Sequence, residues 1–377
     1  MTNRIEQLVE ELVGPQPAGV ALDLLDDHLR RGDSEFVAQF GAVLLRRYGA
    51  GGGEHRYLFE RLLWRLATTP GRENVGHALR LGLAALGEGP RPERRAAAVL
   101  AEYQSVRDLG PVFAPGRSGG GADELRACLI HELALRGGSA EGLPEAVAWA
   151  GASPYWQEHP LSWLPWTLAP QEVRPVVPHY FVGGMTFGSR YTLPEGAPLP
   201  SRAAGDVPLV TANRLDFALE AAVDRWSRRH NGRVESGIHL TDAPVGPDTV
   251  HPVLLSLSLD CLAELAGPDR LTVFTTTPAE AWSVLFAAAS LGGGHSNDWW
   301  YGAYGRLAAW RSVAALVGAP DGAAPAEVEQ LAGACTWYGF SASTHWFNYA
   351  DMDIGLLVLS PDGRRLAVLA ATDYNGG

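Results

Sequence analysis

The feature that most constrains the fold is a proline-dense segment near the middle of the chain. Ten prolines lie between Ser153 and Pro208 in a sequence of 377 residues. Proline lacks a backbone N–H and blocks helical hydrogen bonding, so this stretch cannot continue a helix or a central strand. Three tryptophans of the segment are too apolar to remain in water: Trp156, Trp163 and Trp166. We therefore expect residues 151–208 to form an ordered, extended connector packed against a domain, with a proline-rich recognition segment as the alternative.

Residues 1–150, before this connector, carry the pattern of successive amphipathic helices. In IEQLVEELV, apolar residues recur at spacings of three and four from Ile5 to Val13. Similar stretches follow, separated by short turns of glycine and proline, and short turns make neighbouring helices antiparallel. The pattern predicts a domain of helical hairpins. No strict repeat motif is present, so a solenoid-like stack and a compact bundle both remain open.

Residues 209–377 mix helix and strand patterns, which predicts an α+β domain. The run from Asn213 to Gly232 predicts a helix capped by Asn213, and TPAEAWSVLFAAAS predicts a second helix with a Thr277–Glu280 capping box. VESGIHLTD and RLTVFTTT are typical of strands. The C-terminal stretch alternates around SPDG, residues 360–363, which indicates a β-hairpin. The predicted fold class is therefore α+β, with a helical N-terminal domain before the mixed domain.

The composition excludes several classes of function. All 30 basic residues are arginine, so no lysine is present to form a Schiff base, anchor pyridoxal phosphate or complete a P-loop. A net charge of −12 argues against nucleic-acid binding. The three cysteines lack CxxC spacing, and we expect no disulfide framework, metal or cofactor. Acidic residues interrupt the N-terminal stretch and no long apolar run occurs, so we expect a cytoplasmic protein without a membrane segment.

A glycine-rich loop is the first candidate site. The stretch GGGHSNDWWYGAYG, residues 292–305, joins two predicted helices. His295, Asn297 and Asp298 offer a base, an amide and a carboxylate beside a backbone that ligands can approach closely. A second interpretation makes the rings of the loop a recognition surface: Trp299, Trp300, Tyr301 and Tyr304. A third interpretation is that these rings anchor the loop to its own domain.

A second candidate lies in CTWYGFSASTHWFNYADMD, residues 335–353. It brings together two serines, a histidine and two aspartates: Ser341, Ser343, His345, Asp351 and Asp353. GFSAS resembles half of a nucleophile elbow, but Ser343 stands where that motif requires a second glycine. Metal binding by the histidine and the aspartates is one alternative, and a solvated strand edge is the other.

Two further matches are weaker. His131–Glu132 begins like a zinc-protease helix, but Leu135 stands where the second histidine of HExxH belongs. The Gly376–Gly377 end fits a modifier tail, although the glycine-rich composition explains it more simply.

The segment TTPAEAWSVLFAAASLGGGHSNDWWYGAYGRLAAWRSVAALVGA, together with GRRLAVLAATD near the C-terminus, resembles an uncharacterised family from high-GC bacteria, a domain of unknown function. The resemblance covers roughly residues 205 to 373. It implies no activity and no catalytic residues.

Late aromatic residues carry the main functional hypothesis. Six of the twelve tryptophans lie after residue 281: Trp282, Trp299, Trp300, Trp310, Trp337 and Trp346. Tryptophan and tyrosine are enriched at the centres of interfaces. We therefore expect a non-catalytic protein that binds a protein or a small molecule through an aromatic-rich surface, formed by Trp299, Trp300, Tyr301, Tyr304 and Trp346. The alternative is a hydrolase-type enzyme that uses His295 or His345 with nearby carboxylates, Asp298 and Asp351.

Overall fold

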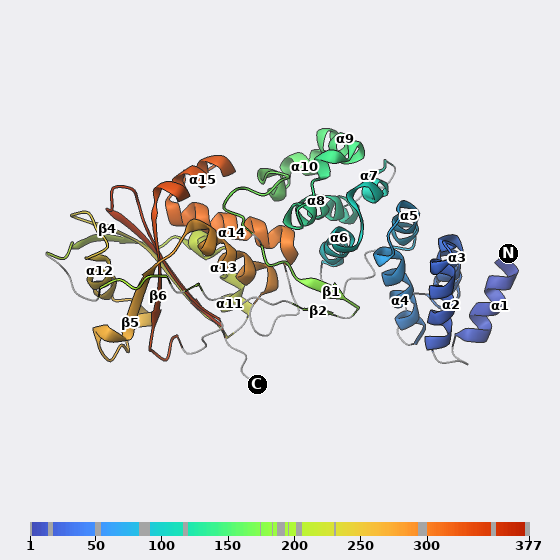
Figure 1. Ribbon diagram of the computed structural model, residues 1–377, viewed down its shortest axis with the longest axis horizontal. Helices are drawn as coiled ribbons and strands as arrows, with labels where there is room; N and C mark the ends of the chain where they lie inside the picture. The colour runs from blue at the N-terminus through green and yellow to red at the C-terminus, as the bar shows by residue number, and fades with distance from the viewer. Residues whose placement is uncertain are drawn as a thin grey trace. The chain divides into compact units, whose positions relative to one another are not determined.

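The computed structural model describes residues 2–13, 18–49, 54–82, 91–115, 120–173, 175–182, 184–186, 193–194, 196–200, 206–229, 231–292, 300–347 and 352–373. The chain divides into two compact units (Figure 1). The helical unit comprises Met1–Ser162 and His179–Thr186, and the sheet unit comprises Trp163–Pro178 and Phe187–Gly377. The proline-dense segment is thus shared between the two units. Helices precede a mixed domain, which confirms the α+β fold class.

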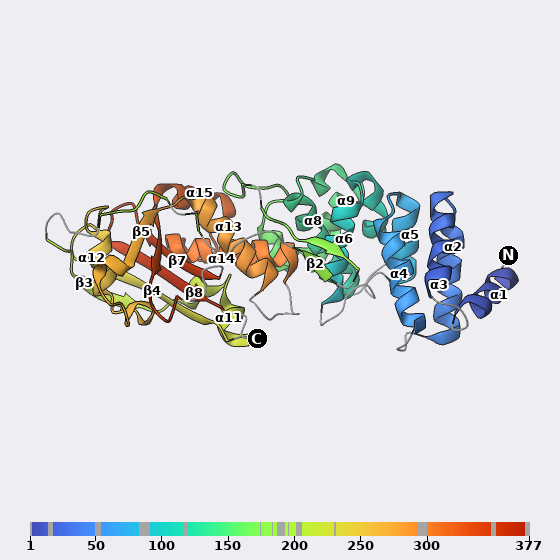
Figure 2. The same ribbon diagram turned by 60° about the horizontal axis from the view of Figure 1, so that its bottom comes forward.

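The helical unit is built from short helices that follow one another along the chain. They are α1 (Thr2–Leu12), α2 (Ala18–Arg30), α3 (Ser34–Tyr48), α4 (Glu54–Thr68), α5 (Arg72–Arg80), α6 (Pro92–Tyr103), η2 (Val106–Leu109), α7 (Gly110–Phe113), α8 (Gly120–Leu135), η3 (Ala140–Gly142), α9 (Pro144–Ala152), α10 (Pro154–Glu158) and η4 (Pro160–Trp163). Figure 2 shows α2 to α5 side by side, each packed on its neighbours. In α4, Leu58, Leu62 and Leu66 form the buried stripe that amphipathic spacing predicts.

A small hairpin from the proline-dense segment completes the helical unit. Its strands, β1 (His179–Phe181) and β2 (Gly184–Thr186), pair antiparallel. The hairpin is bonded to α6: the Tyr103 hydroxyl donates to the Tyr180 carbonyl (2.7 Å), and the Tyr180 N–H donates to Glu102 (3.0 Å). These bonds satisfy backbone groups that a two-stranded ribbon cannot pair by itself.

The sheet unit contains one antiparallel sheet of six strands in the order β3-β4-β8-β7-β6-β5 (Figure 1). The strands are β3 (Val210–Arg214), β4 (Arg233–Thr241), β5 (Leu271–Thr275), β6 (Thr336–Ala342), β7 (Asp353–Leu359) and β8 (Arg365–Thr372). The helical elements of this unit are η5 (Phe217–Glu220), α11 (Asp224–Arg229), α12 (Val250–Ser256), η6 (Asp260–Leu262), η7 (Pro268–Arg270), α13 (Pro278–Leu291), α14 (Tyr301–Val317) and α15 (Pro325–Ala334). Strands β7 and β8 form the predicted hairpin, and the Gly363 N–H closes its turn on the Ser360 carbonyl (2.8 Å).

The sheet is buried on both faces at its centre. Leu357 and Val368 pack with Val250 and Leu254 of α12 on one face. The alternate residues of β7 and β8 are buried as well, and α14 contacts both strands. A strand covered on both faces is apolar throughout instead of alternating, which explains the run LLVL in β7. Helices α13 and α14 pack closely because Gly305 has no Cβ, which would lie 2.6 Å from Ser290 Cβ.

One predicted helix is wrong in most of its length. Asn213 does not cap a helix: it lies in β3, pairs with His239 of β4 and accepts a hydrogen bond from that ring (2.8 Å). Asp216 instead accepts the Ala218 N–H at the start of η5, and a helix appears only in α11. Pairing with β4 overrides the local helix propensity of this stretch. The capping box at Thr277 and Glu280 is confirmed at the start of α13.

A fully buried ion pair joins the proline-dense segment to α14. Arg306 donates from Nε and Nη2 to the two carboxylate oxygens of Glu172, each at 2.6 Å. Arg306 also donates to the carbonyls of Pro165 (2.8 Å) and Thr167 (2.7 Å). The Trp310 indole N–H also donates to Glu172 (2.9 Å). Both charged side chains are shielded from solvent, so each charge depends on the other.

Two further side-chain hydrogen bonds hold the proline-dense segment to the sheet unit. The Trp163 indole N–H donates to the Ala323 carbonyl (2.9 Å), and the Gln171 amide donates to the Glu329 carbonyl of α15 (2.9 Å). Side chains therefore bond a segment whose prolines cannot pair as a strand. Across the described residues, no helix combines the length and the apolar character needed to cross a membrane.

We expect Arg306→Gln to lower the free energy of unfolding of the sheet unit by about 3–5 kcal/mol, because the Glu172 carboxylate would stay buried without its counter-charge. Arg311→Gln, on the exposed side of the same helix, is the matched control and should change it by less than about 0.5 kcal/mol. Urea unfolding of the full chain, followed by tryptophan fluorescence, measures both. Equal losses in the two variants would contradict the importance of the buried pair.

Candidate functional site

The first predicted site is only partly within the described residues. His295, Asp298 and Trp299 lie outside them, as does Asn297. Trp300 is half-buried, and the guanidinium of Arg225 lies 5.0 Å from its ring centre. The described part of the loop therefore leads directly into α14.

The tyrosines of this loop belong to the helix. Tyr301 is the first residue of α14, is 5% exposed and has a φ of +61°, a conformation that bulky side chains rarely adopt. Tyr304 is half-buried one turn later. Trp282, Trp310 and Trp337 are buried too, so the described tryptophans of this region contribute mainly to the core.

Three residues of the second predicted cluster meet at one cavity. Ser341 of β6, Ser343 just beyond it and Asp353 at the start of β7 line a cavity of about 330 Å³. His345 is exposed and is not among the residues that line it, and Asp351 lies outside the described residues. The other lining residues are Leu193, Arg270, Thr272, Phe274, Phe340, Ala342, Phe347 and Gly355. We call this cavity the β6–β7 pocket.

The pocket lies where the pairing of two central strands ends. The pairing of β6 with β7 runs from Thr336–Leu359 to Gly339–Leu356. Beyond that point β6 continues to Ala342 on its other neighbour, β5, while β7 begins at Asp353 on its other neighbour, β8. The cavity therefore lies beside the end of β6 and the start of β7, where each strand is paired with its other neighbour.

Phenylalanine rings form the apolar part of the pocket. Phe340 and Phe347 meet edge to face with ring centres 5.8 Å apart, and Trp346 supports Phe347 from 4.7 Å. Trp346 itself is only 8% exposed and is not one of the lining residues given for the pocket, so it contributes by packing against Phe347. Phe274 lies across Gly339, where a Cβ would come within 2.2 Å of the ring. Because Gly339 has no side chain, the Phe274 ring has room to lie over this position.

Polar groups complete the lining of the pocket. Arg270 has a side chain that is 61% exposed, and its guanidinium lies 4.0 Å from the Asp269 carboxylate. Asp353 accepts a hydrogen bond from the Thr372 hydroxyl (2.6 Å), which fixes the orientation of its carboxylate. Ser341 and Ser343 add hydroxyl groups to the lining. Such a set can bind and orient an organic molecule that has both apolar and charged parts.

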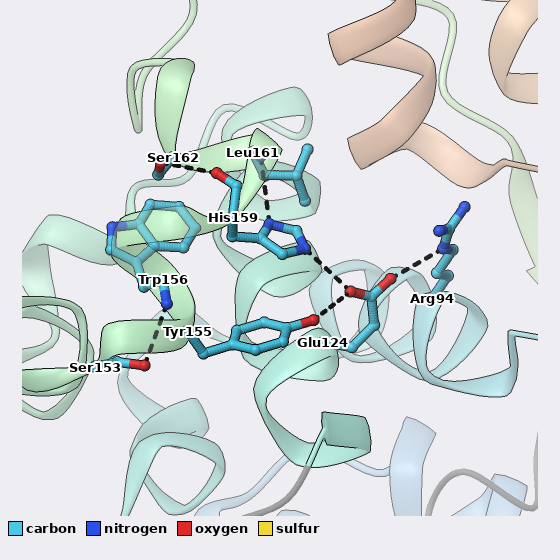
Figure 3. Close-up of polar contacts among 8 residues, drawn as sticks. All are labelled: Arg94, Glu124, Ser153, Tyr155, Trp156, His159, Leu161 and Ser162. Atoms are coloured by element: carbon cyan, nitrogen blue, oxygen red, sulfur yellow. Dashed lines mark hydrogen bonds and ion pairs between the residues drawn. The ribbon is translucent and has the colours of Figure 1, made fainter.

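The helical unit holds a second cluster of titratable side chains, shown in Figure 3. Three side chains converge on Glu124 of α8: Arg94 Nε donates to one oxygen (3.1 Å), while the Tyr155 hydroxyl (2.9 Å) and His159 Nε2 (3.2 Å) reach the other. The Leu161 N–H donates to His159 Nδ1 (3.3 Å), so Nε2 carries the proton that faces Glu124. Arg94, Glu124 and His159 are all buried.

We assign this cluster a structural role. It joins α6, α8 and the segment after α10, and its ionisable side chains Arg94, Glu124 and His159 are buried against one another. Cys128, one turn beyond Glu124, does not offer a nucleophile, because burial and then the charge of Glu124 raise the pKa of its thiol well above the usual value. Among the described residues, no group of three or more His, Cys, Asp or Glu side chains is arranged to hold a metal ion.

Comparison with known proteins gives a family without a known activity. A family model described as a family of unknown function, DUF6183, matches residues 20–375. The chain belongs to the DUF6183 family. The DUF6183 match includes the helical unit and so extends beyond the segment of residues 205 to 373 on which the resemblance rests. No curated protein and no solved structure matches the chain.

Five of the eleven described residues that line the pocket of this DUF6183 protein lie outside the predicted cluster of residues 335–353. Arg270, Thr272 and Phe274 stand in a stretch whose pattern indicates only a strand, and they reach the pocket because β5 pairs with β6. The glycine of GFSAS, Gly339, has a packing role in the structure. Gly339 makes room for Phe274 instead of forming a nucleophile elbow.

We expect Gly339→Ala to destabilise the sheet unit by about 1–3 kcal/mol, because the new methyl group would displace the Phe274 ring. Gly333→Ala is the control: its Cβ would meet no atom within 4 Å, and in α15 it should stabilise the protein by up to about 1 kcal/mol. Thermal unfolding measures whether the two substitutions change the stability of the protein in opposite directions. A neutral Gly339→Ala variant would show that the ring does not depend on this glycine.

A buried histidine of β4 makes stability depend on pH. His239 Nδ1 bonds to Asn213, whereas its Nε2 has no partner among the described residues. Burial lowers the pKa of His239 below 6.5, its value in the unfolded chain, against a smaller opposing effect of Glu235. As the pH falls below 6.5, the unfolded chain takes up a proton before the folded chain does. The contribution of His239 to the free energy of unfolding is therefore fully present above this pH and is lost progressively below it.

Replacing His239 should remove this part of the pH dependence. We expect His239→Gln to make the loss of unfolding free energy between pH 7 and pH 5 smaller, by at most about 1.4 kcal/mol per pH unit. His345→Gln, which removes an exposed imidazole, serves as the control and should leave the slope unchanged. Urea titrations at several pH values give the slopes. A His239→Gln slope equal to that of the parent protein would refute this assignment.

Proposed function

We propose that the sheet unit is a non-catalytic binding module for a small organic molecule, which occupies the β6–β7 pocket. The observation that carries the proposal is the cavity that lies where the β6–β7 pairing ends at Gly339–Leu356, before β6 ends at Ala342 and β7 begins at Asp353. An interrupted strand pair leaves stabilising contacts unmade, and a bound molecule in the opening can supply contacts in their place. The cavity of about 330 Å³ lies at the small end of the range of ligand sites.

The lining favours a ligand with an aromatic or branched apolar group. Phe274, Phe340 and Phe347 offer ring faces and edges, which bind apolar groups with little loss of side-chain freedom. The aromatic residues late in the chain thus have two roles in this proposal. Most of the described tryptophans build the core, whereas the phenylalanines form the recognition surface, with Trp346 supporting Phe347.

Binding is favoured over hydrolysis by the composition of the pocket. Its described lining contains serine hydroxyls but no histidine, and its carboxylate is already oriented by Thr372. A serine nucleophile needs an adjacent base within hydrogen-bond reach. The exposed His345 does not line the pocket, so the hydrolase alternative has no supporting contact among the described residues.

A pocket-filling variant tests the proposal. Ser341→Phe places a ring in the opening, whereas Thr336→Phe, the matched control, adds the same ring to an exposed position at the other end of β6. Ligand-observed NMR with a library of single-ring compounds and the full chain should reveal binders. We expect Ser341→Phe to abolish their binding and Thr336→Phe to retain it. Binders that persist in Ser341→Phe, or a library without any binder, would overturn the proposal.

A further inference from the structure

We infer that the ligand of the β6–β7 pocket is an anion, in chemical class an aromatic monocarboxylic acid. This inference rests on the proposed function and specifies its ligand class. It follows from the order in which apolar, hydroxyl and cationic side chains succeed one another on a single face of strands β5 and β6.

The lining side chains of β5 share one face of the sheet. Leu271 and Val273 pack in the hydrophobic core on the face that α12 covers. Because successive residues of a strand point to opposite faces, Arg270, Thr272 and Phe274 belong to the other face. All three line the pocket. A ligand on this face can therefore contact them together.

Each of these side chains has a neighbour on β6, and the three cross-strand pairs follow one another along the strands. They are Phe274–Gly339, Thr272–Ser341 and Arg270–Ser343. The last pair extends the ladder by one step, because the Ser343 N–H donates to the Arg270 carbonyl (3.1 Å). The lining thus changes in order from an aromatic ring, through hydroxyl groups, to a cation.

The apolar end of this row is suited to an aromatic ring. Phe274 lies over Gly339, and a Cβ on that glycine would also come within 3.0 Å of a Leu193 methyl group. A ligand ring can meet the Phe274 ring in an edge-to-face or offset arrangement. Alternate residues of a strand are about 6.8 Å apart. A carboxylate on a two-carbon chain from that ring would therefore reach the hydroxyl groups on the side of Arg270.

The polar end is suited to a carboxylate. The Arg270 guanidinium offers five N–H donors in a planar fork that matches a carboxylate. Its pair with Asp269 is 4.0 Å long and 80% exposed on the aspartate side, and such surface pairs contribute little free energy. The guanidinium can thus exchange this contact for a ligand at small cost. Exposed hydroxyls can donate further hydrogen bonds to the same carboxylate: Thr272, Ser341 and Ser343.

The charge of this face favours an anion over a cation or a zwitterion. Asp353 is the one carboxylate among the described lining residues. It alternates with the residues of β7 that share the α12 face with Leu357, so it lies on the face opposite Arg270. On the Arg270 face, the described lining therefore carries a positive charge without a negative one. Charge complementarity of this kind selects among ligands of the same shape.

Three probes of similar shape separate the contribution of charge. They are 3-phenylpropanoate, the neutral 3-phenylpropanamide and the cation phenethylamine. Ligand-observed NMR titrations with the full chain measure the dissociation constants. We expect 3-phenylpropanoate to bind at least tenfold more tightly than the amide, because only the carboxylate can form charge-assisted hydrogen bonds with Arg270, and we expect phenethylamine to bind most weakly. Ser341→Phe should abolish the binding of 3-phenylpropanoate and of the amide.

Variants at and beside the cation complete the test. Arg270→Gln should weaken the binding of 3-phenylpropanoate at least tenfold, to the level of the amide, and should leave the affinity for the amide within twofold. Asp269→Asn, which removes the exposed neighbouring carboxylate, is the matched control and should not weaken the binding of either compound. Circular dichroism confirms that each variant is folded.

Two results would overturn the inference, and they differ in what they mean for the proposed function. If the amide or phenethylamine binds the pocket as tightly as 3-phenylpropanoate, or if Arg270→Gln leaves the affinity for 3-phenylpropanoate unchanged, the anion inference fails while the binding module stands. If no single-ring compound binds in a manner sensitive to Ser341→Phe, the proposed function fails and the inference fails with it.

Discussion

The buried pair of Arg306 and Glu172 is the interaction on which the sheet unit depends. Two charges without solvent are tolerated only when their donors and acceptors are satisfied, and here the carbonyls of Pro165 and Thr167, the Ala169 N–H and the Trp310 indole are further partners of the pair. The pair therefore fixes where the proline-dense segment lies and how α14 is rotated. A helix that is apolar on nearly all sides has no amphipathic stripe to orient it, and the pair supplies that orientation.

The covered sheet, in turn, makes the pocket possible. Because β7 and β8 are buried on both faces, their register is strongly specified, and β6 is held by β5 through five residue pairs. The pairing of β6 with β7 can therefore end at Gly339–Leu356 without the sheet losing its order. The phenylalanines that line the opening are then positioned by backbone geometry: Phe274 crosses Gly339, and Phe340 passes Gly355, where a Cβ would collide with the Phe340 carbonyl.

Local features of the fold could be predicted from the sequence, and non-local ones could not. The Thr277–Glu280 capping box and the SPDG turn are encoded within a few residues, and both occur as expected. The helix expected to begin at Asn213 does not form there, because Asn213 pairs as part of a strand with β4, which begins some twenty residues later. The Arg306–Glu172 pair joins residues 134 positions apart. The pocket is less predictable still, because it depends on where two strands stop pairing.

The most direct test of the account is a crystallographic fragment screen of the full chain with single-ring compounds. The account predicts bound fragments in the opening between β6 and β7, in contact with Phe274, Phe340 or Phe347. Fragments bound only elsewhere, or strands β6 and β7 found paired through to Ala342 and Asp353 with the opening closed, would contradict it.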